Sequence, residues 1–238
     1  MISKIKYKRV LLKLSGEALL GNNSRGIDEK IVAFLADEIK KVYLNKIQIS
    51  VVIGGGNIFR GTDAASVGIE RTTADYMGML GTVINALAIQ NALEKKSIPT
   101  RVLSSIPVPA VCETYIRRRA INHLEKKKVI IFAAGTGNPY FTTDTAAALR
   151  ASEISANVIL KATNVDGVYT DDPKKNKKAK KYKIIKYSDI LAKNLKIMDG
   201  SAIALARDNN IPIIVFPINK KNAFLNAIFK KGDYTIIK

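Results

Sequence analysis

Residues 48–57 read QISVVIGGGN, a short apolar run that ends directly in Gly54, Gly55 and Gly56. An unbroken apolar run of this length is typical of a strand that is covered on both faces. Because glycine has no Cβ, the turn after the strand lets backbone N–H groups come close to a phosphate. The same glycines could equally form only a tight turn. The stretch therefore predicts a buried strand followed by a candidate ligand loop.

Further apolar runs of the same kind alternate along the chain with amphipathic stretches. The predicted strands are residues 9–14, 48–53, 100–103, 129–132, 158–161 and 213–216. The predicted helices are residues 28–44, 73–95, 116–125, 143–155 and 201–209. Alternation of strand and helix indicates an α/β fold around a mainly parallel sheet.

The chain has 238 residues, 47% of them hydrophobic, which is enough to bury one sizeable core. We therefore expect a single domain over residues 1–238, with an exposed lysine-rich loop near residues 171–183. The basic start, residues 1–9, has no apolar stretch long enough for a signal sequence, and no run approaches the roughly 20 apolar residues of a membrane span. These features favour a cytoplasmic protein with no membrane partner.

Cysteine and histidine are too rare for several classes of site. Cys112 is the single cysteine, which rules out an internal disulfide. His123 is the single histidine, so a zinc site lacks soft ligands and Cys-His nucleophilic chemistry is improbable.

The charge balance is strongly basic, with 39 basic against 20 acidic residues and a net charge of +19. Such a charge attracts polyanions at low salt, so nucleic acid is a partner to consider. The excess is mostly lysine, accompanied by Ile and Asn, and this favours drift in base composition over selected nucleic-acid binding. The lysine-rich loop is predicted to be a solvated flap, with a nucleic-acid tail as the alternative. Its lysines stand at positions 174, 175, 177, 178, 180, 181 and 183.

Two more predicted strands end in glycine-containing turns. Residues 13–16 read KLSG after the first strand, and residues 135–138 read GTGN after the fourth. Ligands of open α/β sheets gather at the carboxyl ends of the strands, and Arg60 lies close in sequence to the triple glycine. Three such turns favour phosphate binding over purely structural turns. Neither the Walker P-loop nor G-x-G-x-x-G is present, so a different phosphate cradle is expected.

Lysines and acids complete this candidate site. Lys13 and Lys161 close the first and fifth predicted strands, so in a parallel sheet both ammonium groups would project near the same edge, although a strand-end lysine often only reaches solvent. Asp144 opens a predicted helix, where it could orient those lysines, meet magnesium or simply start the helix. Arg71 and Asp75 are four residues apart and could merely pair with each other. Positive groups placed around a migrating phosphoryl group are what phosphoryl transfer requires.

Together these segments resemble the signature blocks of bacterial uridylate kinases, within the amino acid kinase family. The blocks are KLSGE (13–17), VIGGGNIFRG (52–61), DYMGML (75–80), GTGNPYFTTD (135–144) and KATNVDGVYT (161–170). The resemblance runs in order from about residue 8 to the carboxyl terminus. The glycine loops and the KLSG start are shared across the wider family, whereas the blocks at 75–80 and 136–143 are more specific. The family fold is a three-layer α/β/α sandwich.

The resemblance implies a kinase that moves the γ-phosphoryl group of ATP to UMP, giving UDP and ADP in pyrimidine (CTP) biosynthesis. It implies ATP contacts from Lys13, Leu14, Ser15, Gly16, Gly56, Arg60, Thr163, Tyr169 and Asp172. It implies UMP contacts from Gly55, Asp75, Thr136, Gly137, Asn138, Pro139, Tyr140, Phe141, Thr142 and Thr143. By the same resemblance Lys13 and Lys161 stabilise the transition state and Asp144 holds them in place.

Cofactor and regulation follow from the same resemblance. Magnesium is expected to enter with ATP and to keep several waters, so no dedicated protein metal site is expected. Family members are usually homohexamers, inhibited by UTP and often activated by GTP. The apolar helical stretch 77–93 could supply an interface or could be core. Residues 22–25, NNSR, stand where related enzymes carry a loop linked to GTP activation.

Two alternatives compete with this interpretation. One is another member of the amino acid kinase family, acting on acetylglutamate, aspartate or carbamate. The block 136–143 argues against it, as does Asp199 at the place where acetylglutamate kinases have a second catalytic lysine. The other alternative is a nucleic-acid-binding protein that keeps the fold as a scaffold.

Overall fold

The computed structural model describes residues 7–60, 68–171, 173 and 175–238. Its strands are β1 (Arg9–Leu14), β2 (Gln48–Ile53), β3 (Thr100–Ser104), β4 (Glu113–Thr114), β5 (Val129–Ala133), β6 (Val158–Thr163), β7 (Ile184–Ile185), β8 (Ile213–Pro217) and β9 (Thr235–Ile237). Its helices are α1 (Glu29–Tyr43), α3 (Arg71–Glu94), α4 (Arg117–Glu125), α5 (Thr143–Glu153), α6 (Tyr187–Ala192), α7 (Gly200–Asp208), α8 (Ala223–Ile228) and the 3-10 helix η1 (Gly16–Leu19).

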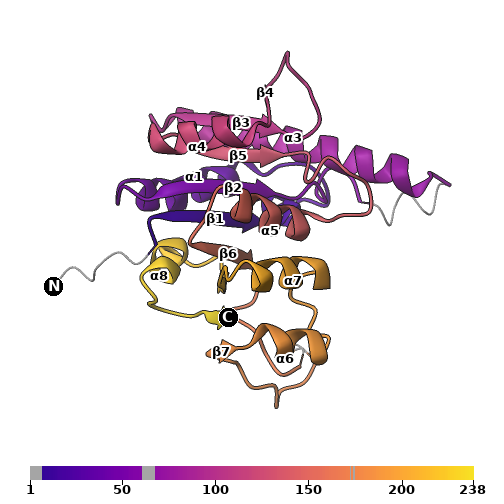
Figure 1. Ribbon diagram of the computed structural model, residues 1–238, viewed down its shortest axis with the longest axis vertical. Coiled ribbons are helices and arrows are strands. Elements are labelled where there is room, and N and C mark those ends of the chain that lie inside the picture. Colours follow the sequence, from indigo (N-terminus) through magenta and orange to yellow (C-terminus); the bar gives the residue numbers. More distant parts are fainter. Residues whose placement is uncertain (1–6, 61–67, 172, 174) are drawn as a thin grey trace.

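The described strands form one sheet in the order β4-β3-β5-β2-β1-β6-β8-β9-β7. Every pairing is parallel except that of β8 with β9. Figure 1 shows this order as a progression from β3 at one end of the molecule, through β5, β2, β1 and β6, to β7 at the other end. The expected α/β class with a mainly parallel sheet is confirmed.

Helices cover both faces of the sheet, which explains the unbroken apolar strands. Along β1, Val10, Leu12 and Leu14 join the core beneath α1, α3 and α8, whereas Leu11 joins the core beneath α5 and α7. Successive side chains of a strand point to opposite faces, so a strand buried on both faces must be apolar at every position. The result is a three-layer sandwich with one core on each face of the sheet.

Helix boundaries follow from local signals. Asp28 is the N-cap of α1, and its carboxylate accepts hydrogen bonds from the backbone N–H groups of Lys30 and Ile31. Lys40 and Lys41 occupy the last turn, where cations interact favourably with the helix dipole. Because α1 is capped at its start and buries one face, it packs against α3 and α8 in a fixed position.

All six predicted strands are present within two residues of their predicted ends, as are the five predicted helices. The prediction missed β4, β7 and β9, of two, two and three residues, and the short helices η1, α6 and α8. Elements this short carry too few residues to establish a hydrophobic period. Among the described residues, no helix combines the length and apolar character needed to cross a membrane.

Candidate active site

Four strand ends meet at one edge of the sheet. The strands β5, β2, β1 and β6 are successive neighbours and run parallel, so the loops that follow them lie side by side. Three of these loops are the glycine-containing turns after β1, β2 and β5. The structure therefore brings the predicted candidate loops to the edge where parallel sheets bind ligands.

A Lys–Asp–Lys cluster lies at this edge. Lys13 on β1 is paired in register with Lys161 on β6, so both side chains project to the same face of the sheet. The Asp144 carboxylate lies between them, with Oδ1 2.6 Å from Lys13 Nζ and Oδ2 2.7 Å from Lys161 Nζ. The side chains of Lys13, Asp144 and Lys161 are only 9%, 13% and 11% exposed. We call these three residues the Lys13–Asp144–Lys161 centre.

Burial and charge determine protonation in this centre. Burial alone would raise the pKa of Asp144, but the ammonium groups of Lys13 and Lys161 outweigh it and hold that pKa below its ordinary value. The pKa of Lys161 is lowered, first by burial and then by the charge of Lys13. Asp144 is therefore an ionised, weak base. Two ammonium groups share one carboxylate, which leaves an excess positive charge that suits an anion.

Close packing explains some of the glycines at this edge, but not all of them. A Cβ on Gly16 would lie 2.7 Å from the backbone N of Gly56, and a Cβ on Gly55 would lie 2.3 Å from the carbonyl oxygen of Gly78 on α3. The structural explanation therefore holds for Gly16 and Gly55. A Cβ on Gly56 would meet nothing nearer than 3.9 Å, so packing does not require glycine there. The open surface at Gly56 leaves its backbone accessible to a ligand.

Two buried asparagines, to which no sequence pattern assigned a role, hold the triple-glycine loop. The side-chain amides of Asn57 and Asn85 exchange two hydrogen bonds, of 2.9 and 2.7 Å. Asn85 Nδ2 also donates to the carbonyl oxygen of Gly54, and Asn57 Nδ2 donates to that of Gly26. A polar residue on the buried face of α3 was the available signal for Asn85. This pair fixes the loop after β2 against α3.

A cavity of about 200 Å³ opens between α3, the loop after β2 and the start of α5. Six predicted site residues line it, namely Gly55, Gly56, Asp75, Phe141, Thr142 and Thr143. Larger hollows lie at other places on the surface, but their linings contain none of the predicted site residues. We therefore take the smaller cavity, which lies beside the candidate loops, as the candidate acceptor pocket.

Asp75 links α3 to the loop after β5. Its Oδ2 accepts a 2.7 Å hydrogen bond from the backbone N–H of Tyr140 and lies 3.2 Å from Arg71 Nε. The guanidinium carbon of Arg71 lies 5.3 Å from the centre of the Tyr140 ring. From the sequence, the pairing of Arg71 with Asp75 could have been a purely local contact within α3. In the structure both residues also contact Tyr140 of the loop after β5.

Local hydrogen bonds hold the rest of that loop, and some of its side chains are exposed to solvent. Thr136 Oγ1 accepts from the backbone N–H of Asn138. Tyr140 and Phe141 are 66% and 55% exposed. Gly137 has φ +84°, a conformation that favours glycine, and Pro139 follows two residues later. Four of the residues predicted to contact UMP, Thr136 and Asn138 to Tyr140, do not line the candidate acceptor pocket.

The residues predicted to contact ATP lie along the other side of the edge. Leu14 ends β1, and its carbonyl oxygen accepts from Gly54 N–H, which joins the first two loops; Ser15 follows as the N-cap of η1. Arg60 donates to the carbonyl oxygen of Gly56 and pairs with Glu17 at 3.2 Å.

Two further predicted donor residues lie beyond Lys161. Thr163 lies two residues after Lys161 and ends β6. Tyr169 donates its hydroxyl to Asp166 at 2.6 Å, a bond that raises the tyrosine pKa. Asp172 lies outside the described residues. Thr163 therefore shares the edge with the centre, whereas Tyr169 belongs to the loop that leaves it.

Asp199, which the sequence distinguishes only as a difference from acetylglutamate kinases, also lies at this edge. It precedes α7 and accepts hydrogen bonds from the hydroxyls of Thr142 and Thr145. Its charge also acts on Lys161, raising the pKa of that lysine against the larger lowering effect of burial. Asp199 thus joins the start of α5 to α7 beside the centre.

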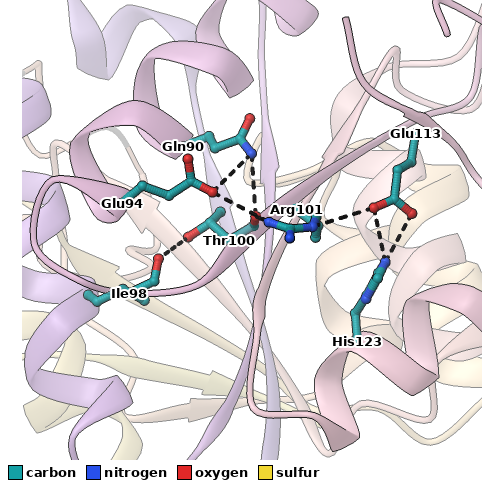
Figure 2. A network of polar contacts seen from close by, with 7 residues as sticks. All are labelled: Gln90, Glu94, Ile98, Thr100, Arg101, Glu113 and His123. Atoms are coloured by element: carbon teal, nitrogen blue, oxygen red, sulfur yellow. Dashed lines mark hydrogen bonds and ion pairs between the residues drawn. The ribbon is translucent and has the colours of Figure 1, made fainter.

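The single histidine lies elsewhere. Figure 2 shows His123 of α4 directed at the carboxylate of Glu113, with Nε2 at 2.9 and 3.2 Å from its two oxygens. Arg101 lies between Glu113 and Glu94 in the same network, 3.6 and 3.5 Å from their carboxylates. These contacts tie β4 to β3, α3 and α4 at one end of the sheet and engage no residue of the candidate edge.

Comparison with known proteins decides the family. A model of the amino acid kinase family matches residues 8–217. The chain belongs to the amino acid kinase family. Among curated members, the uridylate kinase of Rickettsia felis is 54% identical over 237 residues, which cover 100% of this chain and 98% of that protein. The uridylate kinase of Paramagnetospirillum magneticum is 56% identical, with 100% and 99% covered.

Solved structures of this family agree in fold. The UMP kinase of Bacillus anthracis superposes with a TM-score of 0.95 at 43% identity, covering 98% of this chain and 96% of that one. The UMP kinase of Ureaplasma parvum gives a TM-score of 0.94 at 43% identity, with 98% and 99% covered. The resemblance to bacterial uridylate kinases within the amino acid kinase family is therefore confirmed. The chain is a kinase, a phosphotransferase of this family.

Proposed function

We propose that this enzyme transfers the γ-phosphoryl group of ATP to UMP, giving UDP and ADP, in the pyrimidine pathway that leads to CTP. The observation that carries the proposal is the Lys13–Asp144–Lys161 centre, a buried cluster with excess positive charge beside a pocket on the loop edge. Full-length identity of 54–56% to proteins named uridylate kinase supports UMP as the acceptor.

The donor binds on the side of the edge formed by β1, β6 and the loops after them. Backbone N–H groups of the loops after β1 and β2 contact the phosphates, which the close packing of Gly16 on Gly56 and the open face of Gly56 support. The proposed donor contacts are Lys13, Leu14, Ser15, Gly16, Gly56, Arg60, Thr163, Tyr169 and Asp172.

The acceptor binds in the pocket between α3 and the loop after β5. The contact between Asp75 and Tyr140 supports a loop that closes over the pocket from the α3 side. The proposed acceptor contacts are Gly55, Asp75, Thr136, Gly137, Asn138, Pro139, Tyr140, Phe141, Thr142 and Thr143.

Transfer then needs charge stabilisation more than proton removal. The acceptor phosphate has a second pKa of about 6, so at neutral pH it is already largely an oxyanion. Lys13 and Lys161 neutralise charge that develops on the migrating phosphoryl group. Asp144 holds both ammonium groups in position, and its lowered pKa makes it unsuited to act as a base.

Magnesium enters as part of the donor complex. Both oxygens of Asp144 contact lysine ammonium groups, and among the described residues no three His, Cys, Asp or Glu side chains cluster closely enough to hold a metal ion. We therefore assign the ion to the phosphate oxygens and water, where it would neutralise phosphate charge.

The chain is further proposed to act as a single domain in a cytoplasmic homohexamer, with UTP as inhibitor, GTP as possible activator and no nucleic-acid partner. A stripe of exposed apolar residues on α3 supports self-association, since Tyr76, Met77, Leu80 and Ile84 are 36–49% exposed. A monomeric mass in analytical ultracentrifugation would contradict the assembly.

The test of the function is a coupled assay of ADP release from ATP and magnesium, with UMP, CMP, acetylglutamate and aspartate compared in parallel. We expect rapid turnover with UMP alone. Turnover with acetylglutamate or aspartate would identify a different acceptor class within the family, and turnover with none of them would remove the proposed activity.

A further inference from the structure

A buried arginine lies beneath the loop after β5. Arg150, near the end of α5, is 4% exposed. Its Nη1 donates to Glu153 at 2.5 Å, and its guanidinium carbon lies 3.9 Å from the centre of the Tyr115 ring. Its Nη2 donates to the hydroxyl of Ser105 at 2.8 Å, and its Nε is buried without a hydrogen-bond partner among the described residues. Burying a charge in this way costs stability that an apolar side chain would avoid.

The Ser105 hydroxyl connects Arg150 to the loop after β5 by two hydrogen bonds. Its oxygen accepts from Arg150 and its proton is donated to the carbonyl oxygen of Gly135, 2.9 Å away. The direction is fixed, because a guanidinium can only donate and a carbonyl can only accept. Ser105 also packs under Gly137, since a Cβ there would lie 3.1 Å from Ser105 Cβ.

The end of this chain of hydrogen bonds lies at the pocket. Gly135 lines the candidate acceptor pocket, whereas Arg150 and Ser105 do not. On the opposite side, the hydroxyl of Thr82 on α3 accepts from the N–H of Ala134 at 2.6 Å. The base of the loop is thus held between two hydroxyls, and the one on the Ser105 side is anchored by a buried charge.

We propose that Arg150 and Ser105 are positioning residues for acceptor binding, which act by fixing the Gly135 carbonyl and the loop that follows it. This rests on the proposed function, because it takes the loop 135–143 to hold UMP. Neither residue contacts substrate. Their effect is confined to the acceptor side, because the loop after β2 is held separately by Asn57 and Asn85, and the Gly54 N–H of that loop bonds to the Leu14 carbonyl at the end of β1.

The decisive variant is Ser105→Ala, which removes one hydroxyl and leaves the arginine and the core in place. We expect the KM for UMP to rise about fivefold, the size expected from one hydrogen bond, with kcat and the KM for ATP within about twofold of wild type. An unchanged KM for UMP, or an equal rise in both KM values, would overturn the proposal.

A matched control separates positioning from stability. Tyr115→Phe removes the 2.6 Å hydrogen bond from the Tyr115 hydroxyl to Glu153 in the same buried cluster, but leaves the Arg150–Ser105–Gly135 chain intact. We expect this variant to lower the melting temperature and to leave the KM for UMP unchanged. If it raised that KM as much as Ser105→Ala does, the cluster would be purely structural.

A readout without turnover keeps this test separate from the proposed function. Amide hydrogen exchange of residues 134–138 in the ligand-free protein should quicken in Ser105→Ala and not in Tyr115→Phe. If wild type failed to use UMP, the proposed function would fall while faster exchange still supported the anchoring of the loop. Unchanged exchange in Ser105→Ala would overturn that anchoring whatever the acceptor.

Discussion

Two lysine–aspartate clusters in this molecule use the same residue types with different consequences. In the Lys13–Asp144–Lys161 centre, two lysines share one aspartate and all three side chains are at most 13% exposed. In the second cluster, Lys181 contacts Asp166 and Asp233, and Asp233 also contacts Lys220. Those side chains are 29–58% exposed. We call them the surface cluster.

The difference between the clusters lies in charge balance as well as burial. The surface cluster has as many lysines as aspartates, and hydrogen bonds from Lys220 and Lys181 lower the pKa of Asp233. Among its three residues the centre has a lysine in excess, which the nearby charge of Asp199 offsets in part; the centre is shielded from water, so its surplus charge is weakly screened. Ion pairs at a surface contribute little, whereas a buried unbalanced cluster is costly unless an anion completes it. Of these two clusters, the centre is therefore the one whose excess positive charge an anionic ligand would neutralise.

The largest expected effect comes from removing a charge of the centre. Lys13→Ala should lower kcat about 10³-fold, because it removes charge stabilisation of the transition state, and should weaken UMP binding far less. Lys220→Ala, the matched change in the surface cluster, should leave kcat within about twofold. Steady-state kinetics with ATP and UMP make the comparison, and unchanged turnover in Lys13→Ala would remove that residue from catalysis.

A smaller but clear effect is expected on stability. Asp144→Asn should lower the free energy of unfolding at pH 7 by about 3 kcal/mol, because two buried ammonium groups lose their counter-charge. Asp233→Asn in the surface cluster should cost less than about 1 kcal/mol. Urea unfolding monitored by circular dichroism gives both values. Equal losses would mean that burial does not distinguish the clusters.

The pH dependence sharpens the same comparison. The pKa of Asp144 is lowered in the folded state from 3.8, so its contribution to stability is complete above that pH and is lost as pH falls through the folded value. The difference in unfolding free energy between wild type and Asp144→Asn should therefore persist from pH 7 to about 4 and shrink at lower pH. A difference that is constant down to pH 3 would show that the Asn variant loses packing instead of charge.

The sequence was sufficient to predict the residues of the centre and the strands and helix that carry them. Lys13 and Lys161 follow from apolar runs long enough to predict as strands, and their proximity follows from the parallel pairing of those strands. Asp144 could be predicted because it opens a helix directly after a glycine-containing loop. These residues belong to long, periodic elements whose place in the sheet is set by simple rules.

The supporting contacts could not be predicted in the same way. Asp199 meets Thr142 across 57 positions of sequence, and Arg150 meets Ser105 across 45. Both contacts depend on how helices pack after the sheet has formed, and a periodic pattern contains no information about that. Short elements such as β7 could not be predicted for a related reason: two residues form a strand only when a neighbouring strand is already in place.

The smallest effect on kcat/KM is expected from changes in the lysine-rich loop. The lysines described there extend the comparison to charges that are exposed and lie outside the centre. Lys175, Lys177, Lys178 and Lys180 are exposed on the segment that leads to Lys181. Replacing these four by Gln should leave kcat/KM within about twofold, because exposed charges in water are strongly screened by salt. A control variant with Lys126, Lys127 and Lys128 replaced by Gln changes net charge on the segment after α4. If the basic excess is only compositional, both variants should weaken low-salt retention of a DNA oligonucleotide by similar small factors per charge removed. If only the first variant lost retention, the lysine-rich loop would have a selected role in binding polyanions. Exposure alone would not explain such a result, because the lysines of the control variant also lie on a surface segment.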